Sequence, residues 1–163
     1  MNAKPESEKP TDLEAACELL ATLKPGKPLA ALLSTVSSEG RPHATWMFAS
    51  RSTDPGLEIL TITSPDSEKV VNLASKCKVE WLLSSSNRLE QLYLEGDAEF
   101  VKDVAEIKRL WNLIGGKEQA YFLKYYNSGM GFSIIRTRVT AVIYSLPEQY
   151  RKVPFTLDEI LGS

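Results

Sequence analysis

The chain has 163 residues, of which 43% are hydrophobic and 25% charged, and its formal net charge is −2 at pH 7. This length and composition are typical of one globular domain with its own core. Without a basic excess, nucleic acid is not expected as the main partner. No apolar run approaches the roughly 20 residues that a membrane helix needs, so no membrane partner is expected either.

The N-terminus and the cysteines both bear on where the protein works. Residues 1–10 are polar, are expected to be flexible, and contain no apolar signal core, which favours a cytoplasmic protein. Cys17 and Cys77 each fall in an apolar helical pattern, which predicts buried free thiols. Together with His43, the one histidine of the chain, they make no recognisable zinc spacing, so no metal site is predicted.

The first predicted element is a helix that opens at Thr11, which stands three residues before Glu14 as in a capping box. Pro25 and Gly26 predict its end. The hydrophobic pattern then changes to that of strands, which are expected at residues 29–37, 43–50 and 57–63. The turn residues between the first two strands predict an antiparallel hairpin.

A short helix is expected at 64–76, with Ser64 as its cap and Pro65 at its first position. The residues placed on or near its buried face are Val70, Val71, Leu73 and Ala74. Two more strands are expected at 79–84 and 89–101. Gly96 in the second of them predicts a bulge or a close backbone approach.

The last third of the chain begins with a helix, which Asp103 and Glu106 predict by capping-box spacing and which Gly115 ends. A further helix rich in aromatic residues is expected at 117–126. A β-rich segment follows at 132–146, in which the residues of one parity are Thr137, Val139, Ala141 and Ile143.

The strands cluster along the chain with only brief helices between them, which excludes a repeated βαβ arrangement. The pattern therefore predicts a mainly β fold, a small and mostly antiparallel Greek-key-like barrel with peripheral helices. One domain is expected over residues 11–150, followed by a C-terminal tail at 151–163.

The end of the third strand and the helix after it form a candidate anion site. A helix N-terminus exposes unpaired N–H groups and the positive end of the helix dipole. Lys69 could add a charge, and Thr63 and Ser67 could add hydroxyl donors. The alternative is a plain helix start with a solvated lysine, because Asp66 and Glu68 would repel a phosphate unless they point away.

The order of these motifs resembles the pyridoxamine 5′-phosphate oxidase-like FMN-binding split barrels, and among them the general stress protein 26 group. The matching pieces are Gly40-Arg41-Pro42, Thr61-Ile62-Thr63, Ser67-Glu68-Lys69-Val70, Asn72-Leu73, Gln91 to Gly96 and Leu110-Trp111. The resemblance spans about residues 29–146 and rests on order and spacing rather than on one motif.

This resemblance implies a split β-barrel that forms a homodimer, with two FMN sites at the subunit interface. The cofactor-binding residues that it implies are Thr45, Trp46, Met47 and Ser50 on the second strand, Ile62 and Thr63 on the third, Ser67 and Lys69 at the phosphate, Gln91 at the ring, and Tyr144 from the last strand. The oxidases carry basic residues where this chain has Thr45, Ser50 and Glu68, so FMN could bind weakly and true pyridoxamine phosphate oxidase activity is not expected.

No Ser-His-Asp or Cys-His pairing can be built around one histidine, so the catalytic residues are not identified. If the protein is an enzyme, a cofactor supplies the chemistry. The leading hypothesis is an FMN-dependent oxidoreductase that acts on an unknown small molecule. The alternatives are a flavin-binding or sensing module without turnover, and a barrel that binds haem or a deazaflavin instead or has lost its ligand.

Overall fold

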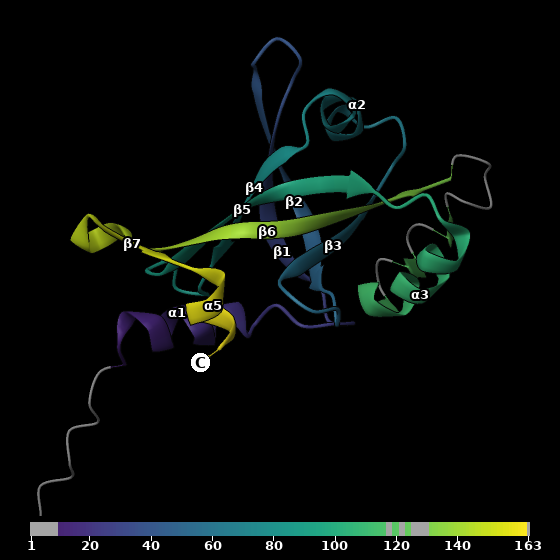
Figure 1. Ribbon diagram of the computed structural model, residues 1–163. Helices are drawn as coiled ribbons and strands as arrows, with labels where there is room; N and C mark the ends of the chain where they lie inside the picture. Colours follow the sequence, from purple (N-terminus) through teal and green to yellow (C-terminus); the bar gives the residue numbers. More distant parts are fainter. Residues whose placement is uncertain (1–9, 117–118, 121–122, 125–130, 163) are drawn as a thin grey trace, which may run out of the picture.

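The computed structural model describes residues 10–116, 119–120, 123–124 and 131–162. Its strands are β1 (Leu29–Val36), β2 (Pro42–Arg51), β3 (Glu58–Thr63), β4 (Lys78–Ser84), β5 (Gln91–Phe100), β6 (Ser133–Leu146) and β7 (Arg151–Phe155). The first six close into an antiparallel barrel, because β3 pairs with both β2 and β6 (Figure 1). The expected mainly β split-barrel fold is therefore confirmed.

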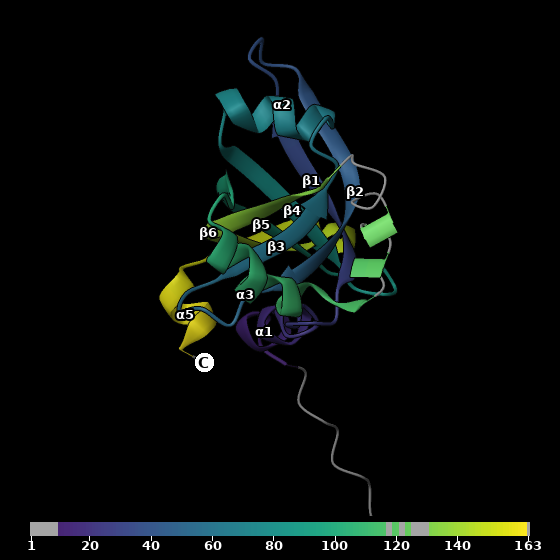
Figure 2. The same ribbon diagram turned by 90° about the vertical axis from the view of Figure 1, so that its right-hand side faces the viewer.

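The helices cover the two ends and one side of this barrel. They are α1 (Asp12–Leu20), α2 (Glu68–Ser75), α3 (Val104–Ile114), the short η1 (Pro147–Gln149) and α5 (Leu157–Leu161). Helix α2 lies at the top of the barrel in Figure 1, whereas α1 and α5 lie together at the bottom. Figure 2 shows α3 on the side formed by β3. The helix expected at 117–126 lies largely outside the described residues.

Side-chain caps set the start of α1 and α3 much as the sequence predicts. The Thr11 side chain accepts a hydrogen bond from Glu14 N–H, and the Glu14 carboxylate accepts one from Thr11 N–H at 2.7 Å. Asp103 caps α3 through Glu106 N–H, but the carboxylate of Glu106 pairs with Arg136 at 2.7 Å instead of completing the box. Helix α1 ends at Leu20, earlier than predicted, because a turn precedes the proline.

Gly96 lies at a bulge, as predicted. The register between β5 and β6 shifts between Glu95 and Gly96. A Cβ atom at position 96 would lie 2.3 Å from the carbonyl oxygen of Arg138, so no other residue fits there without a backbone shift.

The same bulge divides β6 into two halves of opposite parity. Thr140 has no partner on β5, since Glu95 pairs with Ala141 and Gly96 with Val139. The buried residues of β6 are Ile134, Ile135, Thr137 and Val139 before this point and Val142, Tyr144 and Ser145 after it. The single face expected from residues 137 to 143 therefore ends at the bulge.

The C-terminal segment, predicted only as a tail, is part of the folded domain. Strand β7 pairs with the second half of β6. Helix α5 begins with a capping box between Thr156 and Glu159 and packs on α1. An ion pair between Arg151 and Asp12 joins the two chain ends.

The barrel holds the main core, and α3 covers a smaller one. Trp81 is buried in the main core, as expected, and its indole N–H donates to the Thr137 hydroxyl at 3.1 Å. The second cluster consists of Leu60, Ile62, Leu110, Ile114 and Ile134. In the described part of the chain, no helix has the length and apolar character needed to cross a membrane.

Candidate functional site

An opening between β2 and β3 lies at the α2 end of the barrel. Strand β2 pairs with β1 along its length but with β3 only at Ser50 and Arg51. The Thr61 hydroxyl donates to the Phe48 carbonyl at 2.7 Å, just where the two strands separate. On its other edge β3 pairs with β6 along its whole length, so it is the short β2–β3 pairing that leaves the edge of β2 over residues 42–49 without a strand partner among the described residues.

A buried lysine stands beside this opening. Lys69 is 9% exposed, and its Nζ donates to the Thr63 hydroxyl at 3.1 Å. The Thr63 hydroxyl also lies 3.1 Å from the Ser67 hydroxyl, so the three side chains form one cluster. Burial lowers the pKa of Lys69 below the ordinary lysine value, and the charge of Glu68 opposes this shift.

The charge of Lys69 is not neutralised by contact with a carboxylate. No ion pair of Lys69 is found among the described residues, and Thr63 takes one of the three hydrogen bonds that an ammonium can donate. A buried cation is expensive unless it is paired, so this cluster stands out among the described residues as a candidate anion site.

The N-terminus of α2 contributes to the same cluster, though not as predicted. The helix begins at Glu68 with Ser67 as its N-cap, whereas Ser64 donates to Asp66 in the turn before it. Ser64 is therefore not the cap, and Pro65 is not the first helical residue. The Ser67 side chain makes no capping hydrogen bond, because its hydroxyl faces Thr63 instead.

The two acidic residues at this helix start are turned toward other groups. Asp66 accepts a hydrogen bond from Ser64, which lowers the pKa of that carboxyl. Glu68 Oε2 lies 3.2 Å from Nδ1 of His43 on β2. Both side chains therefore have local partners, but their negative charges remain near the helix start.

Helix α2 buries a polar face, contrary to expectation. Its buried residues are Lys69, Asn72 and Leu73, which share one side at i, i+3 and i+4 spacing. Val71, predicted on this face, is 65% exposed, and Ala74 is exposed as well. The Asn72 amide donates to the buried Thr35 hydroxyl of β1 at 3.0 Å, which fixes the helix over the barrel end. The sequence analysis missed the role of this pair, although the spacing of Asn72 from Lys69 was a signal for it.

The predicted site residues of β2 divide between the two faces of the strand. Thr45 and Met47 lie half-buried on the inner side, whereas Trp46 points outward and is 66% exposed. Ser50 is fully buried, and its hydroxyl donates to the Ile114 carbonyl at the end of α3 at 2.9 Å. Ser50 therefore closes a helix terminus instead of joining the Lys69 cluster.

Three other predicted residues lie apart from Lys69. The Ile62 side chain packs under α3, on the opposite face of β3 from Thr63. Gln91 begins β5, which two strands separate from β2. Tyr144 is buried near α1, where burial and a hydrogen bond to Glu90 raise its pKa. Within one chain the side chains of Thr63, Ser67 and Lys69 therefore lie together. The predicted site residues Ser50, Ile62, Gln91 and Tyr144 lie elsewhere.

Comparison with known families identifies the family of the chain. The family profile described as pyridoxamine 5′-phosphate oxidase matches residues 18–145. The chain belongs to this family. No curated protein sequence matches it.

Solved structures with the same fold come from several bacteria. A Clostridium acetobutylicum protein related to general stress protein 26 superimposes with a TM-score of 0.69 at 20% identity, covering 91% of this chain and 96% of that one. A Mycobacterium smegmatis heme binding protein gives 0.66 at 21%, covering 94% and 61%. An FMN binding protein from Nostoc punctiforme gives 0.60 at 14%, covering 78% and 85%. At these identities the likeness shows the fold alone.

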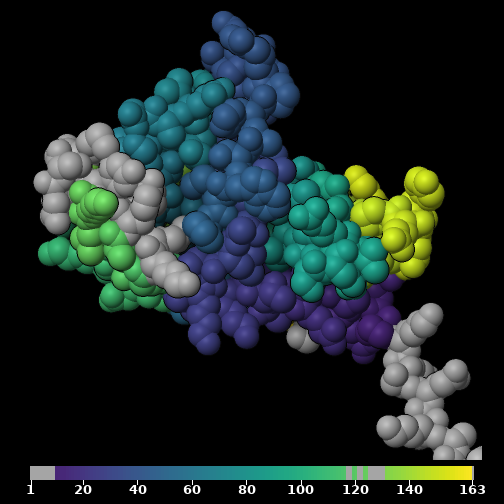
Figure 3. All heavy atoms as spheres, turned by 180° about the vertical axis from the view of Figure 1, so that it is seen from behind, coloured from purple at the N-terminus to yellow at the C-terminus, as the bar shows by residue number. Residues whose placement is uncertain are grey.

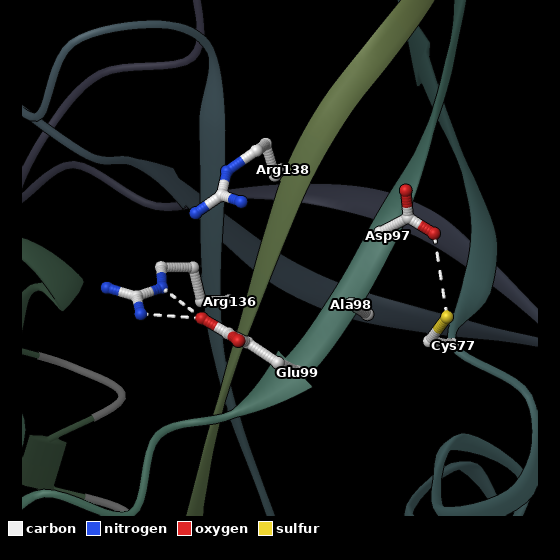
Figure 4. Close-up of a pocket in the computed structure, with 6 residues that line it drawn as sticks. All are labelled: Cys77, Asp97, Ala98, Glu99, Arg136 and Arg138. Atoms are coloured by element: carbon white, nitrogen blue, oxygen red, sulfur yellow. Dashed lines mark hydrogen bonds and ion pairs between the residues drawn. The ribbon is translucent and has the colours of Figure 1, made fainter.

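This member of the pyridoxamine 5′-phosphate oxidase family also has a pocket of about 230 Å³ outside β5 and β6, drawn in Figure 4. Its charged side chains have partners, since Glu99 pairs with Arg136 at 2.5 Å, Asp97 with Lys78 outside the lining at 2.7 Å, and Arg138 with Glu58 at 3.6 Å. Cys77, expected to be buried, is exposed at its rim and points toward Asp97. The Lys69 cluster, with its unneutralised cation, is therefore the stronger candidate site.

Proposed function

We propose that the chain is an FMN-binding flavoprotein in which the Lys69 cluster holds the ribityl phosphate. The observation that carries this proposal is the buried ammonium of Lys69, which one hydroxyl contacts and no described carboxylate neutralises. A phosphate would supply acceptors for its free donors. It would also lie beside the first amides of α2 and the positive end of that helix dipole.

The donor set fits a terminal phosphate even though the chain lacks several basic residues of its family. Thr63 and Ser67 offer hydroxyls that can donate to phosphate oxygens once their mutual contact is exchanged. The single cation implies modest affinity, because charge-assisted hydrogen bonds are about twice as strong as neutral ones and only one such donor is present.

When bound, FMN supplies hydride or electron transfer, and the protein provides binding, orientation and a suitable electrostatic environment. We infer that the unpaired edge of β2, from Thr45 to Met47, lies along the flavin ring. The proposed reaction class is flavin-dependent oxidation or reduction of a small molecule. A cytoplasmic location belongs to this proposal, because the chain has two cysteines far apart in sequence and no cysteine-rich pattern of a disulfide framework.

A homodimer is also part of the proposal. Gln91, which the family resemblance assigns to the ring, stands on β5, three positions from β2 in the order β2-β1-β4-β5. Adjacent strands lie about 4.8 Å apart, so this side chain is about 14 Å from β2 within one chain. A second copy would have to bring its own Gln91 to the site.

The test is a titration of the purified protein with FMN and with riboflavin, which lacks the phosphate, followed by flavin fluorescence. We expect FMN to bind more tightly, and Lys69→Met to lose about 10- to 100-fold of this preference, because a hydrogen bond to a charged group contributes about 1.5–3 kcal/mol. Lys76→Met removes an exposed lysine at the other end of α2 and should leave the preference unchanged. Equal affinity of the native chain for the two flavins would show that the phosphate contributes nothing to binding.

Haem is the second candidate ligand, favoured by the fold shared with the Mycobacterium smegmatis heme binding protein. A Soret band after haem addition, together with no flavin binding, would replace the first proposal by this one. If flavin does bind, reduction by NAD(P)H and reoxidation by an added acceptor would distinguish an oxidoreductase from a binding or sensing module.

A further inference from the structure

An apolar row crosses the outer face of the sheet. In cross-strand order its members are Trp46, Leu32, Leu82, Tyr93, Ile143 and Pro154, each paired with the next. Trp46 at one end is 66% exposed, although it is one of the largest apolar side chains of the protein. Figure 3 shows the side of the molecule where β2 and the β4–β5 region reach the surface between α2 and α1. Pro154 at the other end is exposed as well, and the four members between are half-buried, so the row offers apolar surface to a partner.

Two carboxylates stand side by side next to this row. Glu80 on β4 pairs directly with Glu95 on β5, so both side chains point to the same outer face. Like charges directly opposite each other destabilise a sheet. Burial of the half-exposed Glu80, and after it the charge of Glu95, raise the pKa of Glu80, while Lys152 acts in the opposite direction.

The other elements around this pair bring little compensating charge. The cross-strand neighbours are Ser34 on β1 and Ala141 on β6, which are neutral. Lys152 on β7 lowers the pKa of Glu80, and its Nζ lies over the Tyr93 ring, 4.6 Å from the centroid. Lys78, two residues before Glu80 on the same face of β4, pairs with Asp97 at 2.7 Å. Any partner that covers the row would therefore remove water from two adjacent acids with one lysine near them.

We propose that a second copy of this chain docks on this face and that the Glu80–Glu95 pair takes up a proton as the dimer forms. This inference rests on the homodimer proposed above. Removing water disfavours the charged form of an acid, and a neighbouring like charge adds to the effect. Protonation of one member of the pair leaves an acid that can donate a hydrogen bond to the other.

A second copy is the occupant that the surface favours. The face carries two acids and one lysine, which does not suit nucleic acid or an anionic membrane surface. At about 4.8 Å per strand the row is about 24 Å long along the sheet. Together with one neighbouring row on each side it covers a band about 20 Å wide, or roughly 500 Å² of the sheet surface. A standard interface buries about 800 Å² per partner, which is of the same order. The face also carries Trp46 on β2 and Gln91 on β5. The proposed function assigns both to the flavin ring, and one chain alone does not bring them together.

The consequence is a dimer that tightens as the pH falls. Each proton taken up on association lowers the dissociation constant up to about tenfold per pH unit, within the window between the acid's pKa in the monomer and its higher pKa in the dimer. Sedimentation equilibrium of the full-length, flavin-free protein between pH 8 and pH 5.5 measures this constant. We expect a falling constant in the native chain. We expect a constant independent of pH, and a dimer already present at pH 8, in the double variant Glu80→Gln with Glu95→Gln.

Two further variants separate the acid pair from the face and from general charge effects. Glu39→Gln with Glu148→Gln removes two exposed acids elsewhere on the surface and should keep the native pH dependence. Leu82→Glu adds a charge in the middle of the row and should leave a folded monomer, checked by circular dichroism, at every pH.

The inference is overturned if the native chain is monomeric throughout, or if its dimer weakens as the pH falls. A dimer that weakens with added salt and needs both acids ionised would show that they pair with Lys152 of the second copy instead. Flavin titration of the same samples distinguishes the two proposals. A pH-linked dimer that binds no flavin refutes only the flavin site. A monomer that binds FMN leaves the phosphate site at Lys69 standing and refutes the homodimer together with its proton linkage.

Discussion

The two ends of the barrel are closed in opposite ways. At one end α1 and α5 pack together and place apolar side chains, among them Leu20 and Ile160, on the core. At the other end α2 buries Lys69 and Asn72, while its Val71 faces solvent. The strands between the ends are shared, so the difference lies in the helices.

This contrast separates stability from function within one small domain. Burial of apolar area stabilises the α1 end by the hydrophobic effect, at about 25 cal/mol per Å². The α2 end instead keeps a desolvated ammonium that lowers stability until an anion binds. Natural proteins retain such local costs mainly where they bind or react.

The largest effect is expected from Leu20→Ala at the apolar end. Leu20 is buried, and removing its side chain leaves a cavity that costs about 2–5 kcal/mol of unfolding free energy. Urea denaturation measures this loss. Leu161→Ala, on the partly exposed residue of α5, is the matched control and should cost much less. Equal losses in the two variants would mean that this end is not closed by α1.

An intermediate effect is expected from Tyr144→Phe, which removes the hydroxyl that donates to Glu90. Loss of one hydrogen bond to a carboxylate should lower the unfolding free energy by about 1.5–3 kcal/mol. Because Tyr144 is buried far from Lys69, FMN affinity should not change. Tyr150→Phe, on an almost fully exposed residue, should alter neither property. A selective loss of FMN affinity would instead show that Tyr144 contacts the cofactor, as the family resemblance implies.

The smallest effect, and the one of opposite sign, is expected from Lys69→Met. At pH 7 the folded, flavin-free chain holds a charged amine that burial disfavours, so the variant should be more stable by about 1 kcal/mol. The pKa of Lys69 is lower in the folded than in the unfolded chain, where it is near 10.5. The gain should therefore shrink as the pH rises from the folded value toward 10.5, because the folded state has then lost the proton that the unfolded state still holds.

Urea denaturation at several pH values tests this sign. Lys76→Met, on the exposed lysine at the other end of α2, should show no such trend. If Lys69→Met is instead less stable than the native chain at pH 7, the ammonium already has a compensating partner in the folded protein, and the α2 end is not strained.

The sequence by itself determined the elements and much of their order. Capping residues such as Thr11 and Asp103 mark helix starts because they satisfy the first unpaired amides, which needs only local chain geometry. Gly96 marked the bulge because a side chain there would strike the neighbouring strand. The candidate anion cluster was also readable, since Thr63, Ser67 and Lys69 lie within seven residues of one another.

The tertiary structure alone decided which surfaces meet. The hydrophobic pattern predicted that Val71 is buried and gave no role to Asn72. In the structure Asn72 is buried instead, because its amide donates to the Thr35 hydroxyl on β1 beside the opening next to β2. Ser50 was predicted as a cofactor-binding residue, but its hydroxyl donates to the Ile114 carbonyl at the end of α3. Such choices depend on partners distant in sequence, and a buried polar group is stable only where one of them supplies its hydrogen bond.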